Sequence, residues 1–412
     1  MLNRSSVITA VAAAILAANG GVSFAKEKPP EPPKPPTVSK PLVKPLTASQ
    51  AASKAEKWAE CLAAAREADA IPNKTAYDTY VVNEMIGVCA IRSGDNAASA
   101  KAFEQLLDSE FTDAARKSSL LRTLMQINYM AKDYAKAIEF GNRAIRDGSA
   151  NDEIRLLVAQ AYYLLPDYKG TLAFVEGWVN ESEKSGATPS DNALGLFLSA
   201  CIKLEDDACT MRALVKQATY HPKPDTWPNL IVMMLQNATD DGTLEIYRLA
   251  SEVGAMRRGE DYLEMAQLAT GKGLPGEAQA ALEAAIAKKT WADPKSADTA
   301  IRLLATAKTQ AAADKASLPA QAKAAASGKN GQVDVLMGHA FLSYGQYPEA
   351  VAAIQRGLGK GNVKDVAEAQ LALGHAHLRL GNKADALKAF NAVQGNELMT
   401  RLANLWAVQA QR

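Results

Sequence analysis

From residue 48 to the end of the chain, apolar residues recur at the three- and four-residue spacing of amphipathic helices. The segments with this spacing are about 12 to 18 residues long and are joined by short turns, and none keeps the two-residue alternation of a strand. The pattern therefore predicts an all-α fold. Residues 335–358 and 371–393 also align with each other end to end, which indicates that the helices repeat as pairs.

The two aligned segments share small residues at matching places. Gly338 corresponds to Gly374, and Ala350 corresponds to Ala386. Small residues let the two helices of a pair touch, while larger residues fill the space around the contact. This spacing resembles the tetratricopeptide repeat family, on the strength of Met337, Gly338, Phe341, Tyr347, Ala350 and Ile354 in the first copy and Leu373, Gly374, Ala386 and Phe390 in the second. The resemblance implies a right-handed α-solenoid of antiparallel helix pairs.

Weaker copies of the repeat can be followed upstream. They include Ile86, Gly87, Phe103 and Leu106, then Leu124, Tyr134, Ala137 and Ala144, then Val158, Ala159, Tyr162, Tyr168 and Trp178, with further helix pairs over 194–219 and 262–286. Gly141 stands where a large residue is usual and His377 where a core aromatic is usual, so the exact repeat count stays open.

The repeats suggest a division of the chain. We expect an N-terminal array over residues 48–292, an Ala-rich helical bridge over 293–330, and a C-terminal pair of repeats with a capping helix over 331–412. A degenerate repeat is the alternative to the bridge, and Pro319 is expected to break it into two helices. The final helix carries Leu402, Leu405 and Trp406 on one face, which is the usual means of closing a solenoid.

Residues 1–25 have the pattern of a secretory signal peptide, with Arg4, an apolar run from Val7 to Ala18, and Ser-Phe-Ala before Lys26. Cleavage is expected after Ala25. An uncleaved anchor is the alternative, but a span needs roughly 20 apolar residues and this run is shorter. No later stretch is long enough, so we expect a periplasmic or secreted protein without a membrane span after cleavage.

Residues 26–47 hold 8 of the 18 prolines and no aromatic residue. Such a segment cannot bury a core, and we expect an extended polyproline spacer. A ligand for an aromatic-lined groove is the alternative interpretation of its Pro-Pro-x-Pro-Pro pattern.

Charge and motifs exclude several classes of function. The 46 basic and 45 acidic residues leave a net charge of +1, which gives no electrostatic reason for nucleic-acid binding. There is no Gly-x-Ser-x-Gly, no His-Glu-x-x-His and no phosphate loop between a strand and a helix. Asp206 and Asp207 are interpreted as a solvated turn. An enzyme is thus the least favoured class, and we expect no cofactor and no metal.

Four cysteines in an exported chain suggest disulfides. Cys201 and Cys209 each lie four residues from Glu205, the centre of a turn, so antiparallel helices bring them to nearly the same height. This spacing predicts a bridge. Cys61 and Cys89 lie at unequal distances from the turn near Pro72, and a bridge between them stays open beside the alternative of buried free thiols.

Binding residues follow from the repeat register. In the family that the sequence resembles, the first helix of each repeat lines a concave groove. The matching positions here are Arg122, Tyr129, Gln160 and Tyr163, together with His339, His375 and Arg379 in the C-terminal pair. Gln126 joins them because residues 122, 126 and 129 share one helix face.

These residues lead to a hypothesis about function. Tyr, Gln and Arg suit an extended peptide or a glycan. We therefore expect a scaffold that binds an envelope protein or peptide through the groove. The alternatives are a carbohydrate-binding or polysaccharide-export accessory protein, with Tyr129 and Tyr163 as stacking platforms, and a solvated groove without a dedicated ligand.

Overall fold

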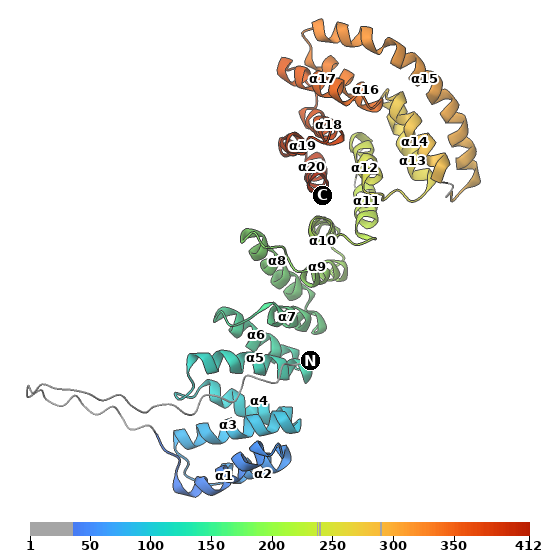
Figure 1. Cartoon of the computed structure of the whole chain (residues 1–412). Helices are drawn as coiled ribbons and strands as arrows, with labels where there is room; N and C mark the ends of the chain where they lie inside the picture. Colours follow the sequence, from blue (N-terminus) through green and yellow to red (C-terminus); the bar gives the residue numbers. More distant parts are fainter. Residues whose placement is uncertain (1–35, 237, 239, 289–290) are drawn as a thin grey trace, which may run out of the picture. The chain divides into compact units, whose positions relative to one another are not determined.

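The computed structural model describes residues 36–236, 238, 240–288 and 291–412. Every regular element in these ranges is an α-helix, as the sequence predicts (Figure 1). The expected signal peptide lies outside them. The helices are α1 (Lys40–Lys54), α2 (Trp58–Asp69), α3 (Ala76–Ser93), α4 (Asn96–Leu107), α5 (Ala114–Met130), α6 (Tyr134–Arg146), α7 (Asp152–Leu164), α8 (Tyr168–Lys184), α9 (Asp191–Lys203), α10 (Asp207–Tyr220), α11 (Thr226–Gln236), α12 (Asp240–Glu252), α13 (Gly259–Gly271), α14 (Pro275–Lys288), α15 (Pro294–Ser327), α16 (Gly331–Ser343), α17 (Tyr347–Lys360), α18 (Val366–Arg379), α19 (Lys383–Asn391) and α20 (Glu397–Gln411).

The chain forms two compact units, residues 1–117 and 118–412, and α5 crosses the boundary between them. Consecutive helices from α1 to α4, and again from α6 to α20, contact one another, which is the arrangement of an α-solenoid. The all-α solenoid expected from the sequence is confirmed.

A recurrent turn joins the two helices of a pair. A residue with positive φ, such as Gly94 or Lys132, is followed by the N-cap residue of the second helix. Aspartate caps α4, α6, α8 and α10, and its carboxylate accepts a hydrogen bond from the backbone N–H three residues later. The repeated turn explains why successive pairs keep a common register.

The small residues of the repeats lie where two helices meet. A Cβ atom added at Gly87 would overlap the ring of Phe103, and one added at Gly374 would overlap Phe390. At Gly338 the overlap would be with Ile354. The close approach expected at these glycines is therefore present in the structure.

Two expectations about proline were wrong. Residues 40–47 are not extended, because α1 begins at Lys40 and contains Pro45. Pro41 is in the first turn, where its missing N–H costs no hydrogen bond, and Leu42 and Leu46 are buried in a cluster with Leu62 of α2. Packing of apolar side chains thus outweighs the proline content there.

Pro319 likewise does not divide the Ala-rich stretch, since α15 is one helix of 34 residues. Near this proline, Leu318 and Ala325 are buried in a cluster with Met337 of α16 and Ala353 of α17. Contacts on both sides of Pro319 hold the helix in line despite the lost backbone hydrogen bond.

Both disulfides are present. Cys201 and Cys209 join α9 to α10 with a Cα–Cα distance of 5.4 Å, which confirms the prediction from the turn. Cys61 and Cys89 join α2 to α3 at 5.6 Å, which resolves the pairing that the sequence left open. The Oγ of Ser49 in α1 donates to the carbonyl of Cys61 (2.9 Å), so α1 contacts the first bridge directly.

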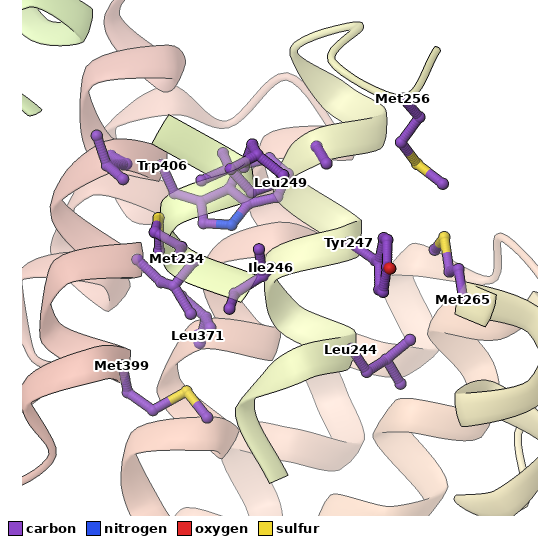
Figure 2. Packing of buried hydrophobic residues seen from close by; sticks show 14 of the residues in the cluster. Met234, Leu244, Ile246, Tyr247, Leu249, Met256, Met265, Leu371, Met399 and Trp406 are labelled. Carbon is purple, nitrogen blue, oxygen red and sulfur yellow. The ribbon is translucent and has the colours of Figure 1, made fainter. Parts of the chain in front are cut away.

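The largest core of the second unit surrounds α12. Leu244, Ile246, Tyr247 and Leu249 of this helix are buried, and Figure 2 shows Trp406 of α20 near Leu249. The C-terminal helix α20 contacts α10, α12 and α18, as well as its neighbour α19 (Figure 1). Its apolar face therefore joins parts of the unit that lie far apart in the sequence.

Candidate functional site

The predicted groove residues of α5 and α7 form one surface, which we call the tyrosine surface: Arg122, Gln126, Tyr129, Gln160 and Tyr163. The hydroxyl of Tyr129 donates a hydrogen bond to Oε1 of Gln160 (3.1 Å), which joins the two first helices directly. Arg122 and Gln126 are exposed, and the other three are half-buried. The structure thus brings these five residues of consecutive repeats together.

Each tyrosine of this surface is held by a second ring. Tyr129 meets Tyr134 edge to face with centroids 5.7 Å apart, and Tyr163 meets Tyr168 in the same way at 5.4 Å. Burial, helped by Tyr134, raises the pKa of Tyr129, so its hydroxyl stays protonated at neutral pH. The ring contacts hold the tyrosines in place, and Arg122 and Gln126 are the exposed polar groups of the surface.

The C-terminal candidates lie elsewhere in the second unit. His375 and Arg379 of α18 line a cavity of about 370 Å³, which also contacts α12, α14, α16 and α20. Its polar lining includes Arg248, Ser251, Glu277 and Ser343, while Tyr347 and Trp406 supply aromatic surface. Arg379 forms an ion pair with Glu252 of α12. The cavity therefore lies between the C-terminal repeats and helices outside the two segments that carry the strong repeat signal.

A buried ion network lies at this cavity. Nε and Nη2 of Arg248 donate to the two carboxylate oxygens of Glu277 at 2.7 and 2.6 Å, and Arg248 also pairs with Glu245. Burial raises the pKa of Glu245, which is 1 % exposed. Burial opposes ionisation of Glu277 as well, but the charge of Arg248 outweighs it and lowers the pKa of Glu277. The network is structural, because Arg248 has both carboxylates as partners.

The two histidines are enclosed rather than displayed. His339 is 9 % exposed, and burial together with the charge of Arg248 lowers its pKa to about 4. Burial and Arg248 also hold the pKa of His375 well below its usual value, and its ring lies 4.3 Å from that of Trp406. Both are neutral at pH 7. Of the C-terminal candidates, His375 and Arg379 line the cavity, whereas His339 is not among its lining residues.

Sequence reasoning missed Arg248, Glu277 and Trp406 as cavity residues. The spacing within α12 and α14 shows two helices, but it does not show which helix faces meet those of α18 and α20. Arg248 and Glu245 recur at a three-residue spacing within the apolar residues of α12, and such a pair of opposite charges on one helix face is the signal that could have drawn attention.

Two further observations bear on the kind of site. Within residues 36–236, 238, 240–288 and 291–412, no group of three or more His, Cys, Asp or Glu residues could hold a metal ion. In the same ranges, no helix combines the length and the apolar character that crossing a bilayer requires.

Comparison with known proteins agrees with the repeat spacing. Residues 85–153 and 335–397 match the model of the tetratricopeptide repeat, and these two segments are tetratricopeptide repeats. No curated protein matches the chain.

Several solved structures resemble it. In the TPR2AB-domain:pHSP90 complex of yeast Sti1, the matching chain is 15% identical to this protein. The alignment covers 73% of this protein and 100% of the matching chain, with a TM-score of 0.25. A tetratricopeptide repeat protein from Parabacteroides merdae is 13% identical to this protein. The alignment covers 80% of this protein and 98% of the Parabacteroides chain, with a TM-score of 0.30. In the structure of Naa15/Naa10 bound to HypK-THB, the matching chain is 13% identical to this protein. The alignment covers 86% of this protein and 58% of the matching chain, with a TM-score of 0.40.

Proposed function

We propose that this protein is an exported scaffold that binds an extended segment of an envelope protein across the tyrosine surface. The hydrogen bond between Tyr129 and Gln160 carries the proposal, because it aligns equivalent faces of two consecutive first helices. Tetratricopeptide repeats suggest a protein-interaction scaffold, and they match at residues 85–153. Catalysis has no place in this proposal.

The chemistry of the surface suits a peptide main chain. The exposed amide of Gln126 both donates and accepts hydrogen bonds, and the guanidinium of Arg122 donates to carbonyl or carboxylate oxygens. Arg122 reaches the carbonyl of Ser149 at 3.4 Å, a long contact that a ligand oxygen would replace at little cost. The fixed rings of Tyr129 and Tyr163 add contact area with little loss of conformational entropy.

Two features that are typical of exported proteins support an envelope protein as the partner. The two disulfides fit an oxidising compartment, in which structural disulfides form and persist. The pattern of residues 1–25 is that of a signal peptide. These features support a partner in the periplasm or outside the cell.

A photo-crosslinking experiment tests the proposal. A photoreactive residue at Gln126 should attach to an envelope protein in intact cells, whereas one at Glu139, exposed on α6, should not. The Tyr129→Ala/Tyr163→Ala variant should reduce the Gln126 product and keep its fold. Equal labelling from both positions would contradict the proposal. Suppression of the product when free sugar is present during irradiation would favour a glycan ligand instead.

A further inference from the structure

A second hollow lies in the first unit, whereas the tyrosine surface belongs to the second. It has a volume of about 350 Å³ and lies between α3, the end of α4 and the turn that follows it. We call it the Asn83 cavity. Residues 76, 79, 80 and 83 share one face of α3, and Leu106 and Phe111 lie on the opposite side. Its volume is within the range of pockets that hold small molecules.

Asn83 is the unusual residue of this cavity. It is 6 % exposed, yet its side-chain amide forms no hydrogen bond with any described residue. The amide atoms of Asn83 nevertheless keep some solvent-accessible surface. They differ in this from unpartnered polar atoms that are completely enclosed, such as Nε1 of Trp406. The cavity is therefore the space that the amide atoms of Asn83 face. A buried amide without a partner costs free energy unless water or a ligand satisfies it.

Aromatic rings lie at the same cavity. The rings of Tyr80 and Phe111 line it with centroids 5.9 Å apart, and Tyr77 meets Phe111 edge to face at 5.2 Å. Burial and the nearby charge of Glu84 raise the pKa of Tyr80, so its hydroxyl is a donor at neutral pH. The cavity thus has aromatic rings, set at an angle to one another, in its lining, while Asn83 provides an amide within it.

The charges of the rim narrow the choice of ligand. Asp108 and Glu110 line the cavity, whereas no Lys or Arg does so. The nearby Arg116 forms two hydrogen bonds with the carboxylate of Glu84, at 2.8 and 2.5 Å. Its charge is therefore compensated. An anionic ligand would meet the carboxylates of Asp108 and Glu110, and an apolar ligand would leave Asn83 without a partner.

We propose that the Asn83 cavity binds a neutral saccharide residue. Sugar hydroxyls donate to the carboxylates of Asp108 and Glu110, and they accept from the amides of Asn83 and Gln105. The C–H face of a pyranose lies against an aromatic ring such as that of Phe111. The chemistry of a sugar, with a hydroxylated edge and an apolar face, matches both sides of the cavity.

The test is titration of the full-length mature protein with glucose, mannose, galactose and N-acetylglucosamine, with saturation-transfer NMR as readout. At least one of these sugars should bind, and glucuronic acid should bind less than glucose. Asn83→Leu replaces the amide with an apolar side chain of similar size and should abolish binding. Gln105→Ala, at an exposed rim position, should weaken binding about fivefold, which corresponds to one hydrogen bond.

The matched control is Gln126→Ala, also an exposed helical glutamine, on the tyrosine surface. This variant should leave sugar binding unchanged, while Asn83→Leu should leave crosslinking at the tyrosine surface unchanged. The two proposals therefore succeed or fail separately. The saccharide proposal is overturned if none of the four sugars binds in large molar excess, or if folded Asn83→Leu and Gln105→Ala bind as the wild type does. If Asn83→Leu does not fold, Gln105→Ala decides.

Discussion

Arg248 and Glu277 form a two-pronged ion pair, at 2.7 and 2.6 Å, between helices that are separated in sequence by α13. Neither residue belongs to the segments that match the repeat family. The side chains of Arg248 and Glu277 are 13% and 15% exposed, and the pair borders the cavity that contains His375. The pair thus joins α12 to α14 at the edge of a cavity that the C-terminal repeats also line.

The first prediction concerns this pair. Arg248→Ala should lower the free energy of unfolding by about 3 to 5 kcal/mol, because it leaves the carboxylates of Glu245 and Glu277 buried without their cation. The control is Arg212→Ala, which removes a surface pair with Glu176 whose side chains are 52% and 34% exposed and should cost about 1 kcal/mol or less. Denaturant unfolding measures both. Equal losses would show that Arg248 is better solvated than its contacts indicate.

The second prediction compares two helical glycines. Gly374→Ala should destabilise by about 1 to 3 kcal/mol, since its Cβ would overlap the ring of Phe390. Gly177→Ala should instead stabilise by about 0.5 to 1 kcal/mol, because no atom lies within 4 Å of the added Cβ in α8. Thermal unfolding of the two variants checks the opposite signs. A stable Gly374→Ala protein would contradict the close helix contact.

The third prediction ranks the two disulfides. Removing the bridge between Cys61 and Cys89 should cost about 3 to 4 kcal/mol, and removing that between Cys201 and Cys209 about 2 to 3 kcal/mol, because the first closes a longer loop. The paired Cys→Ala variants should be compared by denaturant unfolding in the same buffer. The reverse order would mean that native-state packing, rather than loop closure, sets the difference.

The fourth prediction concerns pH. The pKa of His339 is about 4 in the folded protein, below the ordinary value near 6.5, so the unfolded chain binds more protons between these values. The contribution of His339 to stability is complete above about pH 6.5 and is lost as pH falls toward 4. Its size is on the order of 2 to 3 kcal/mol. Burial also lowers the pKa of His375, which adds to the loss in the same direction.

The effect of Glu245 on the pH dependence of stability is opposite to that of the two histidines. Burial raises the pKa of Glu245. Its contribution to the stability of the fold is therefore present at low pH and is lost as pH rises through its pKa in the folded protein. The variant His339→Gln separates the effects, since it should reduce the dependence of stability on pH between 6.5 and 4 while His375 and Glu245 remain. Melting temperatures across this range measure the slope. An unchanged slope in His339→Gln would exclude His339 as the group that titrates.

The fifth prediction concerns processing. The short apolar run before Ser-Phe-Ala should lead to cleavage after Ala25, so that the mature protein begins at Lys26. N-terminal sequencing of protein from a periplasmic fraction checks this. Recovery of Met1 in a membrane fraction would support an uncleaved anchor instead.

Much of the fold could be read from residues near one another in sequence. The spacing of apolar residues predicts helices, and the correspondence of Gly338 with Gly374 predicts that they repeat as pairs. Cys201 and Cys209 could be paired because a single turn separates them, and a turn of known length sets the relative height of two antiparallel helices. The tyrosine surface follows from the same short-range register, since Tyr129 and Gln160 lie on consecutive first helices.

Other features were decided only by contacts between distant parts of the chain. Burial of Leu42 and Leu46 makes residues 40–47 helical despite their prolines, and contacts of Leu318 and Ala325 keep α15 continuous through Pro319. The cavity around Arg248, Glu277 and His375 depends on the meeting of α12 and α14 with α18 and α20. Sequence spacing determines which residues share a helix face. Which face meets another helix more than a hundred residues away depends on the angles accumulated at every intervening helix contact, and these arise from side-chain packing in three dimensions.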